Sequence, residues 1–165
     1  MKRRQLTLAA LALLPWAGVR AAAPEDARPL IDWPAIRLLD GRTVEPASWQ
    51  GQAAVVVFWA TYCPYCRRHN AHVDQLERAT RGQGLRVLGV ALDADAAAVR
   101  RYMERNGFGF PVTLDGGDLR RRLTDRRVIP MTCSIDRGGR LLQAIPGEMS
   151  RDDVMEFARL GRPAG

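Results

Sequence analysis

Residues 53–66 read AAVVVFWATYCPYC, and this stretch decides how the rest of the chain is interpreted. The apolar, β-branched run over residues 53–59 is typical of a central strand that is covered on both faces. Cys63 and Cys66 follow it with two residues between them, and a helical pattern begins at Pro64. The sequence therefore predicts a pair of thiols at the junction between a buried strand and a helix.

A Cys-x-x-Cys pair can be a redox dithiol, half of a zinc site or part of a haem attachment site. Structural zinc normally needs a second ligand pair, and the chain has neither a second Cys-x-x-Cys nor a His-x3–5-His. Covalent haem attachment requires His directly after the second cysteine, where this chain has Arg67. A static disulfide between Cys63 and Cys66 would close too small a loop to add much stability. A redox dithiol is the leading interpretation.

The positions of the two cysteines predict different roles. A thiolate, not a thiol, is the reactive species. We expect Cys63 at the start of the helix, where free backbone N–H groups and the helix dipole stabilise negative charge. Cys66 is expected one turn further in and less exposed. We therefore predict that Cys63 attacks a substrate disulfide and that Cys66 resolves the mixed disulfide.

Residues 1–21 have the pattern of a secretory signal peptide. Three basic residues, Lys2, Arg3 and Arg4, precede an apolar stretch over residues 6–17, and the small residues at 21–23 offer cleavage points. That stretch is too short for a membrane span of about 20 residues. We predict cleavage near residues 21–23 and a periplasmic protein, with the twin-arginine and general secretory routes both open.

The basic character of the chain argues little for a nucleic-acid partner. Its formal net charge is +7, and loss of residues 1–21 removes four positive charges and leaves +3. The remaining arginines include clusters at residues 120–122 and 126–127. Such clusters are usually solvated helix faces, and an exported protein meets little nucleic acid. We expect no nucleic-acid partner.

Beyond residues 53–66 the patterns alternate between strand and helix. Strands are expected at residues 85–92 and 110–114, in an N-terminal hairpin over 36–44, and in a second hairpin formed by 131–135 and 141–145. Helices are expected over residues 64–81, over 96–106 after a capping Asp95, in a short segment from residue 116, and from a capping Ser150. No repeat or linker divides this order. We predict an extended lead-in over residues 22–35 and a single α/β domain over 36–165.

Three further residues have more than one interpretation. His69 and His72 continue the three-residue spacing of the cysteines, but steps of three fan side chains across half of a helix, so they cannot all converge on one ion. We expect solvent-facing histidines, with a soft-metal site as the alternative. Cys133, beside Met131 and Ile135 in a predicted strand, is expected to be a buried apolar thiol. The alternative for Cys133 is a regulatory or mixed-disulfide thiol.

Two motifs resemble the thioredoxin superfamily. Residues 58–66 resemble its active-site motif, and residues 129–139 resemble the active-site proline strand and the hairpin of the TlpA/ResA-like branch. The hairpin at 36–44 and the extra helix and strand between residues 93 and 114 also match that branch. The resemblance covers about residues 33–160. It implies a thioredoxin-like α/β fold with a mixed central sheet, an N-terminal hairpin and an inserted helix–strand segment.

The same resemblance implies the function and its site. It points to an extracytoplasmic thiol–disulfide oxidoreductase that needs no cofactor and no metal, with Cys63 and Cys66 as the catalytic residues. In this fold the proline at Pro130 is usually cis and lies beside the dithiol. A substrate surface is expected from the residues around both motifs, namely Trp59, Tyr62, Pro64, Tyr65, Ile129 and Pro130. The expected partners are protein disulfide or dithiol substrates and a membrane redox partner that recycles the dithiol.

Departures from the pattern leave some points open. Thioredoxins carry a buried Asp six residues before the first cysteine, whereas this chain has Val57. Pro64 and Tyr65 assign neither a strongly reducing nor a strongly oxidising potential, and we favour the reductase direction. A peroxidase would need a Thr-x-x-Cys site, which the paired cysteines do not fit. The alternative from another class is a copper- or haem-handling carrier that uses Cys63, Cys66 and His69.

Overall fold

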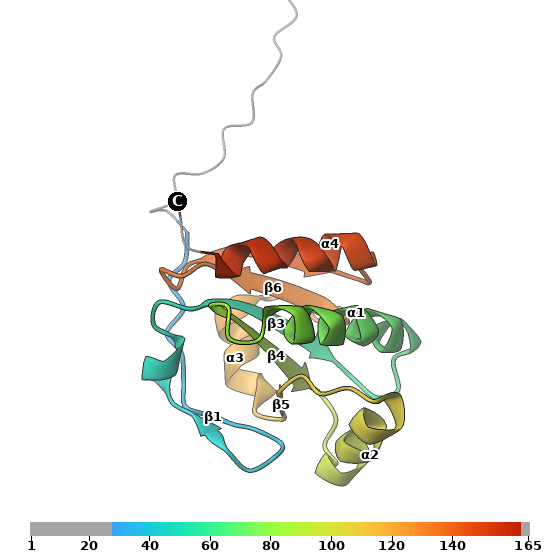
Figure 1. Cartoon of the computed structure of the whole chain (residues 1–165). Helices are drawn as coiled ribbons and strands as arrows, with labels where there is room; N and C mark the ends of the chain where they lie inside the picture. Colours follow the sequence, from blue (N-terminus) through green and yellow to red (C-terminus); the bar gives the residue numbers. More distant parts are fainter. Residues whose placement is uncertain (1–27, 163–165) are drawn as a thin grey trace, which may run out of the picture.

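The computed structural model describes residues 28–162, and strand β3 (Ala53–Trp59) lies at its centre (Figure 1). All seven residues of β3 are buried. Side chains alternate along a strand, so Val55, Val57 and Trp59 face one layer while Val56 and Phe58 face the other. The continuous apolar run therefore serves two cores, as the sequence predicts. The predicted signal peptide and its cleavage points lie outside the described residues.

The central sheet has five strands in the order β5-β4-β3-β6-β7. Strands β4 and β5 run parallel to β3, while β6 is antiparallel to β3 and β7 to β6. The bounds of these strands are β4 (Leu85–Ala91), β5 (Val112–Thr113), β6 (Met131–Ile135) and β7 (Leu141–Pro146). A separate hairpin joins β1 (Ile36–Arg37) to β2 (Thr43–Val44). The mixed sheet and the N-terminal hairpin confirm the predicted fold class.

Helices cover both faces of the sheet (Figure 1). One face carries α1 (Pro64–Thr80), α2 (Ala96–Asn106), α4 (Arg151–Glu156) and the 3-10 helix η3 (Phe157–Gly161). The other face carries α3 (Gly116–Leu123), the β1–β2 hairpin and the 3-10 helix η2 (Pro46–Trp49). Among residues 28–162, no helix combines the length and apolar character needed to cross a membrane.

Local signals set the helix ends as the sequence predicts. The Asp95 carboxylate accepts a hydrogen bond from the Ala97 N–H at 2.8 Å, and α2 ends at Gly107 in the left-handed conformation with φ 66°. The Ser150 hydroxyl oxygen accepts from the Asp153 N–H at 3.2 Å at the start of α4. These caps fix where α2 and α4 begin. Both helices belong to the layer that covers the same face of the sheet as α1.

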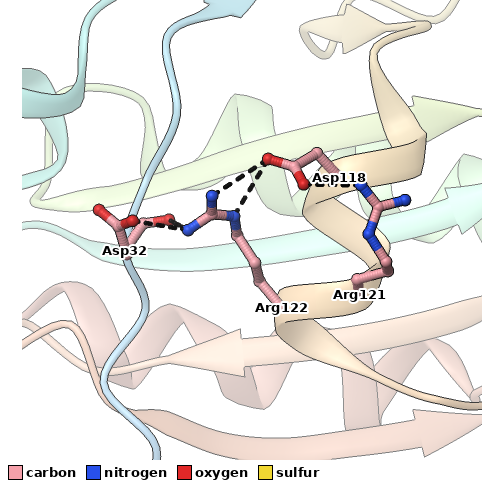
Figure 2. Close-up of polar contacts among 4 residues, drawn as sticks. All are labelled: Asp32, Asp118, Arg121 and Arg122. Carbon is pink, nitrogen blue, oxygen red and sulfur yellow. Dashed lines mark hydrogen bonds and ion pairs between the residues drawn. The ribbon is translucent and has the colours of Figure 1, made fainter.

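The described part of the lead-in packs onto the domain more closely than its sequence indicates. The Ile31 N–H donates to the Gly139 carbonyl at 2.8 Å, so the lead-in borders the β6–β7 turn. Arg122 of α3 holds it from the other side, because its guanidinium donates to the Asp32 carbonyl at 2.8 Å and carboxylate at 2.7 Å, and also contacts Asp118 (Figure 2). This arginine of the predicted basic cluster therefore has a structural role.

Candidate active site

Cys63 and Cys66 form a disulfide at the N-terminus of α1. Cys63 is the N-cap residue and Pro64 takes the first helical position, where its missing N–H removes no helix hydrogen bond. The Cys66 N–H donates to the Cys63 Sγ atom at 3.1 Å, an interaction that also stabilises a thiolate at Cys63 after reduction. Cys63 is 8% exposed and Cys66 is 0% exposed. A partner can thus reach Cys63 before Cys66, which is the order that the predicted roles require.

Exposed apolar side chains surround this end of the sheet. Four large apolar side chains in residues 28–162 are prominently exposed, and three of them belong to the active-site loops: Tyr62 at 74%, Tyr65 at 58% and Val128 at 51%. Pro64 is exposed between the two tyrosines. An apolar rim beside a reactive sulfur is suited to contact with a polypeptide.

The second loop of the site precedes β6. The Ile129–Pro130 peptide bond is cis, and Met131 pairs with Phe58 in the β3–β6 ladder. That register places Pro130 beside Trp59 at the end of β3 that leads to Cys63. Ile129 is partly buried and packs against the core cluster that contains the two cysteines. The structure thus brings the two predicted motifs together from positions more than sixty residues apart.

The prediction that Trp59 belongs to a substrate surface is wrong, because its side chain is fully buried. Trp59 is the last residue of β3, and the alternation of the strand directs it under α1 and α2. Its ring lies 5.1 Å from that of Tyr102 and 6.4 Å from that of Phe110, measured between centroids. Trp59 therefore packs in the core next to the site, where a protein partner cannot contact it.

The expectation that both histidines face solvent is wrong for His69, which is fully buried. Its Nδ1 atom accepts a hydrogen bond from the Met149 N–H at 3.3 Å, and its Nε2 atom lies 2.9 Å from the Thr132 hydroxyl oxygen. The proton of the neutral ring is therefore on Nε2, which donates to Thr132. Burial, with a smaller contribution from His72, lowers the pKa of His69 to about 4. His72 is partly exposed and its Nδ1 contacts the Met149 carbonyl at 3.3 Å.

The inner face of α1 is more polar than its apolar residues indicate. Besides His69, it buries Asn70, Asp74 and Glu77, while Ala79 is exposed. The buried positions that follow Cys66 in α1 are 69, 70, 73, 74, 76, 77 and 80, which recur at helical steps of three and four along one face. That spacing is the signal that would have placed His69 on the inner face. Thr132 pairs with Val57 in the β3–β6 ladder. The side chains of His69 and Thr132 therefore place polar atoms on the α1 side of the sheet, where thioredoxins have an Asp and this chain has the apolar Val57.

Cys133 lies on the opposite face of the sheet from the dithiol. It is fully buried, it is not in a disulfide, and it packs in the cluster under α3. Burial raises the pKa of its thiol to about 12. The interpretation of Cys133 as a buried apolar thiol is therefore confirmed, and the sheet separates it from Cys63 and Cys66.

The soft-metal alternative for the histidines has no support in the geometry. Across residues 28–162, no three side chains of His, Cys, Asp or Glu gather closely enough to hold a metal ion. His69 directs both ring nitrogens into hydrogen bonds with Thr132 and Met149. A carrier that uses Cys63, Cys66 and His69 together is not favoured by this arrangement.

Comparisons with known proteins agree with this geometry. The family model described as Redoxin matches residues 26–160. The thiol-disulfide oxidoreductase ResA of Halalkalibacterium halodurans is 30% identical over 125 residues, which are 76% of this chain and 71% of that protein.

Solved structures give the same result. A thiol:disulfide interchange protein of the thioredoxin family from Chlorobium tepidum has a TM-score of 0.75 and 26% identity, over 86% of this chain and 99% of that one. StoA from Bacillus subtilis, at 19% identity and a TM-score of 0.65 over 74% of this chain and 93% of its own, shares the fold.

Proposed function

The chain belongs to the redoxin family and is a TlpA/ResA-like thiol–disulfide oxidoreductase of the thioredoxin superfamily, and from this premise we propose that it reduces disulfides in periplasmic protein substrates. The observation that carries the proposal is the unequal burial of the two cysteines at the start of α1, 8% exposed for Cys63 and 0% for Cys66. Cys63 can contact the substrate, while Cys66 lies behind it in the protein interior.

The reaction follows from that arrangement. In the reduced protein the Cys63 thiolate attacks one sulfur of a substrate disulfide, a new S–S bond forms, and the other substrate sulfur leaves as a thiolate that takes up a proton. Cys66 then loses its proton and attacks the Cys63 sulfur. This closes the Cys63–Cys66 disulfide and releases the second substrate thiol. The dithiol gives the substrate two electrons; one of the two protons that the substrate takes up balances the proton lost by Cys66, and the other comes from solvent, which received the Cys63 proton when the thiolate formed.

The loops around the sulfurs supply the contacts that a polypeptide needs. Tyr62, Pro64 and Tyr65 are exposed next to Cys63, and they provide apolar area for the residues that flank a substrate cysteine. We assign the second wall to the loop before β6, where Ile129 is partly buried and packs against the cluster that contains the cysteines, and Pro130 is buried behind it. An extended substrate segment placed between these loops can form main-chain hydrogen bonds with the backbone of Ile129.

The proposed compartment rests on the signal-peptide pattern of residues 1–21. Outside the cytoplasm a dithiol that reduces its substrates must be reduced again after each turnover. We therefore include a membrane redox partner that passes electrons to the Cys63–Cys66 disulfide. The conversion needs only thiols and disulfides, so the proposal includes no cofactor.

The direction of the reaction is tested by the reduction potential of the Cys63–Cys66 couple. Equilibration in glutathione buffers, followed by alkylation and mass measurement, gives the ratio of dithiol to disulfide. We expect a potential more reducing than about −200 mV, in the range of thioredoxins and glutaredoxins. A value of about −120 mV, typical of strong oxidants, would make the protein an oxidase of its substrates.

A separate experiment tests the compartment. In intact cells, a thiol reagent that cannot cross the membrane should label the exported protein, and the exported protein should retain its reductase activity.

A further inference from the structure

Building on the proposed function, we propose that the loop over residues 124–128 selects substrates whose cysteine lies in an acidic segment with apolar flanking residues. The loop leads directly into Ile129 and Pro130, so whatever it contacts lies next to the site of exchange. Arg126, Arg127 and Val128 are all exposed on it. Among the described residues 28–162, neither Arg126 nor Arg127 forms an ion pair with a carboxylate.

Arg120 of α3 holds the backbone of this loop in place. Its guanidinium donates to the Arg126 carbonyl oxygen from Nε at 3.1 Å and from a terminal nitrogen at 2.8 Å, and that nitrogen also reaches the Val128 carbonyl at 3.5 Å. The same guanidinium lies 5.5 Å from the ring centroid of Phe58, which is fully buried in β3. Because Arg120 binds backbone atoms, the side chains of Arg126 and Arg127 stay free to meet a partner.

A third unpaired cation, Arg67, lies next to Cys66 on α1, away from the loop over residues 124–128. It follows Cys66 in the first turn of α1, it is exposed, and it has no carboxylate partner within residues 28–162. The next residue, Arg68, is different, because Glu148 neutralises it through contacts of 2.7 Å and 2.6 Å. Arginines that are not balanced by carboxylates therefore lie on both segments of the site, α1 and the loop before β6.

The carboxylates close to the site do not cancel this charge. Asp93 is partly buried, and its oxygens accept from the Thr61 N–H at 3.0 Å and from the Thr61 hydroxyl at 2.5 Å. Asp125 is the exposed acid on the loop itself. Three unpaired arginines against one exposed carboxylate leave a positive rim. Together with exposed Tyr62, Tyr65 and Val128, that rim is complementary to an acidic and apolar polypeptide segment.

The test uses the reduced protein and two disulfide-linked peptides with the same aromatic residues beside the cysteine. One peptide carries glutamates at the neighbouring positions and the other carries lysines. We expect the second-order rate constant for reduction to be about tenfold higher for the acidic peptide at low salt, and the difference to shrink as salt screens the charges. Equal rate constants for the two peptides would overturn the inference while leaving the proposed function intact.

Variants locate the effect in the loop. The double variant Arg126→Glu/Arg127→Glu should reverse the preference between the peptides. If the reversed charges prevent folding, the neutral double variant Arg126→Gln/Arg127→Gln replaces it and should abolish most of the preference. Arg105→Glu is the matched control: Arg105 is exposed in the last turn of α2, and Gly107 just beyond it contacts Arg78 far along α1. The control should keep the wild-type preference, and a control that loses it equally would overturn the assignment to the loop.

Arg120→Met tests whether the loop must be held. We expect a higher KM for the acidic peptide with an unchanged rate toward a small symmetric disulfide, because Cys63 itself is untouched. Equal changes in both rates would overturn this positioning role for Arg120.

Sedimentation with anionic phospholipid vesicles tests whether the surface binds a membrane and not a peptide. Vesicle binding that needs Arg126 and Arg127, without any peptide preference, would assign the surface to a membrane and overturn the inference. If the wild type reduces neither peptide nor the small disulfide, the proposed function itself fails.

Discussion

The three cysteines occupy two regions that give one kind of side chain opposite chemistry. Cys63 and Cys66 lie at the N-terminus of α1, where a backbone N–H contacts the Cys63 sulfur and Cys63 keeps 8% of its surface exposed. Cys133 lies in the middle of β6, fully buried, with a thiol pKa raised by burial to about 12. The difference teaches that reactivity here is set by the position of a sulfur relative to a helix end and to solvent.

A single step along β6 separates the two regions. Thr132 faces the dithiol layer and binds His69, while Cys133 faces the layer under α3. Neighbouring residues of a strand face opposite sides of a sheet, so the β6 backbone keeps the buried thiol away from the exchange reaction. A third thiol in the same protein can therefore be retained without competing with Cys66 for the mixed disulfide.

The largest expected effect tests the difference between the two sulfurs of the dithiol. Cys63→Ser should abolish turnover, because the attacking sulfur is gone. Cys66→Ser should trap mixed disulfides with substrate proteins, because Cys63 still attacks and nothing resolves the product. Non-reducing gels and mass spectrometry of the trapped species measure both outcomes. Equal trapping by the two variants would contradict the assigned roles.

The position of the dithiol and the fold were accessible from sequence because they depend on local patterns. The apolar run of β3 predicts a two-sided strand, and Asp95, Gly107 and Ser150 act through hydrogen bonds or backbone conformations within a few residues. Strand bounds at β6 match the prediction, because Met131 to Ile135 lie between a proline and a turn. Features of this kind are set by residues that are neighbours in the chain.

The features that the sequence did not reveal depend on distant contacts. His69 is polar and carries no sign that Thr132 and Met149 will satisfy its two ring nitrogens. Trp59 belongs to a strand end whose exposure depends on α2, which begins more than thirty residues later. Whether a polar or aromatic residue beside an active site faces a partner or the core is decided by tertiary packing, and composition does not encode it.

The next effect concerns His69, which joins the dithiol layer to β6. Its folded-state pKa of about 4 lies below the ordinary value of 6.5, so the unfolded chain binds a proton more readily than the native protein. The stability that depends on neutral His69 is complete above about pH 6.5 and is lost as the pH falls towards 4. Between pH 7 and pH 5 we expect a loss of about 2 kcal/mol in the free energy of unfolding from this residue.

Urea unfolding at several pH values measures this effect. His69→Gln should be less stable than the wild type at pH 7, by about 1–3 kcal/mol, because two buried hydrogen bonds are disturbed. Its stability should change less between pH 7 and pH 5 than that of the wild type. His72→Gln is the matched control on the same helix, since it removes a histidine while leaving His69 in place. A wild-type pH slope in His69→Gln would show that another group is responsible.

The smallest expected effect is at Cys133, the other side of the comparison. Cys133→Ala removes one buried sulfur from the cluster under α3 and should lower the free energy of unfolding by about 1 kcal/mol through the cavity that it leaves. The rate of disulfide exchange should not change, because the sheet separates Cys133 from Cys63. In the native reduced wild type, a thiol with a pKa of about 12 stays protonated and shielded at pH 8, so alkylation of Cys133 should occur only through unfolding. Fast alkylation of Cys133 in the folded protein, or a loss of exchange in Cys133→Ala, would show that the two regions are not independent and that the third thiol takes part in the reaction.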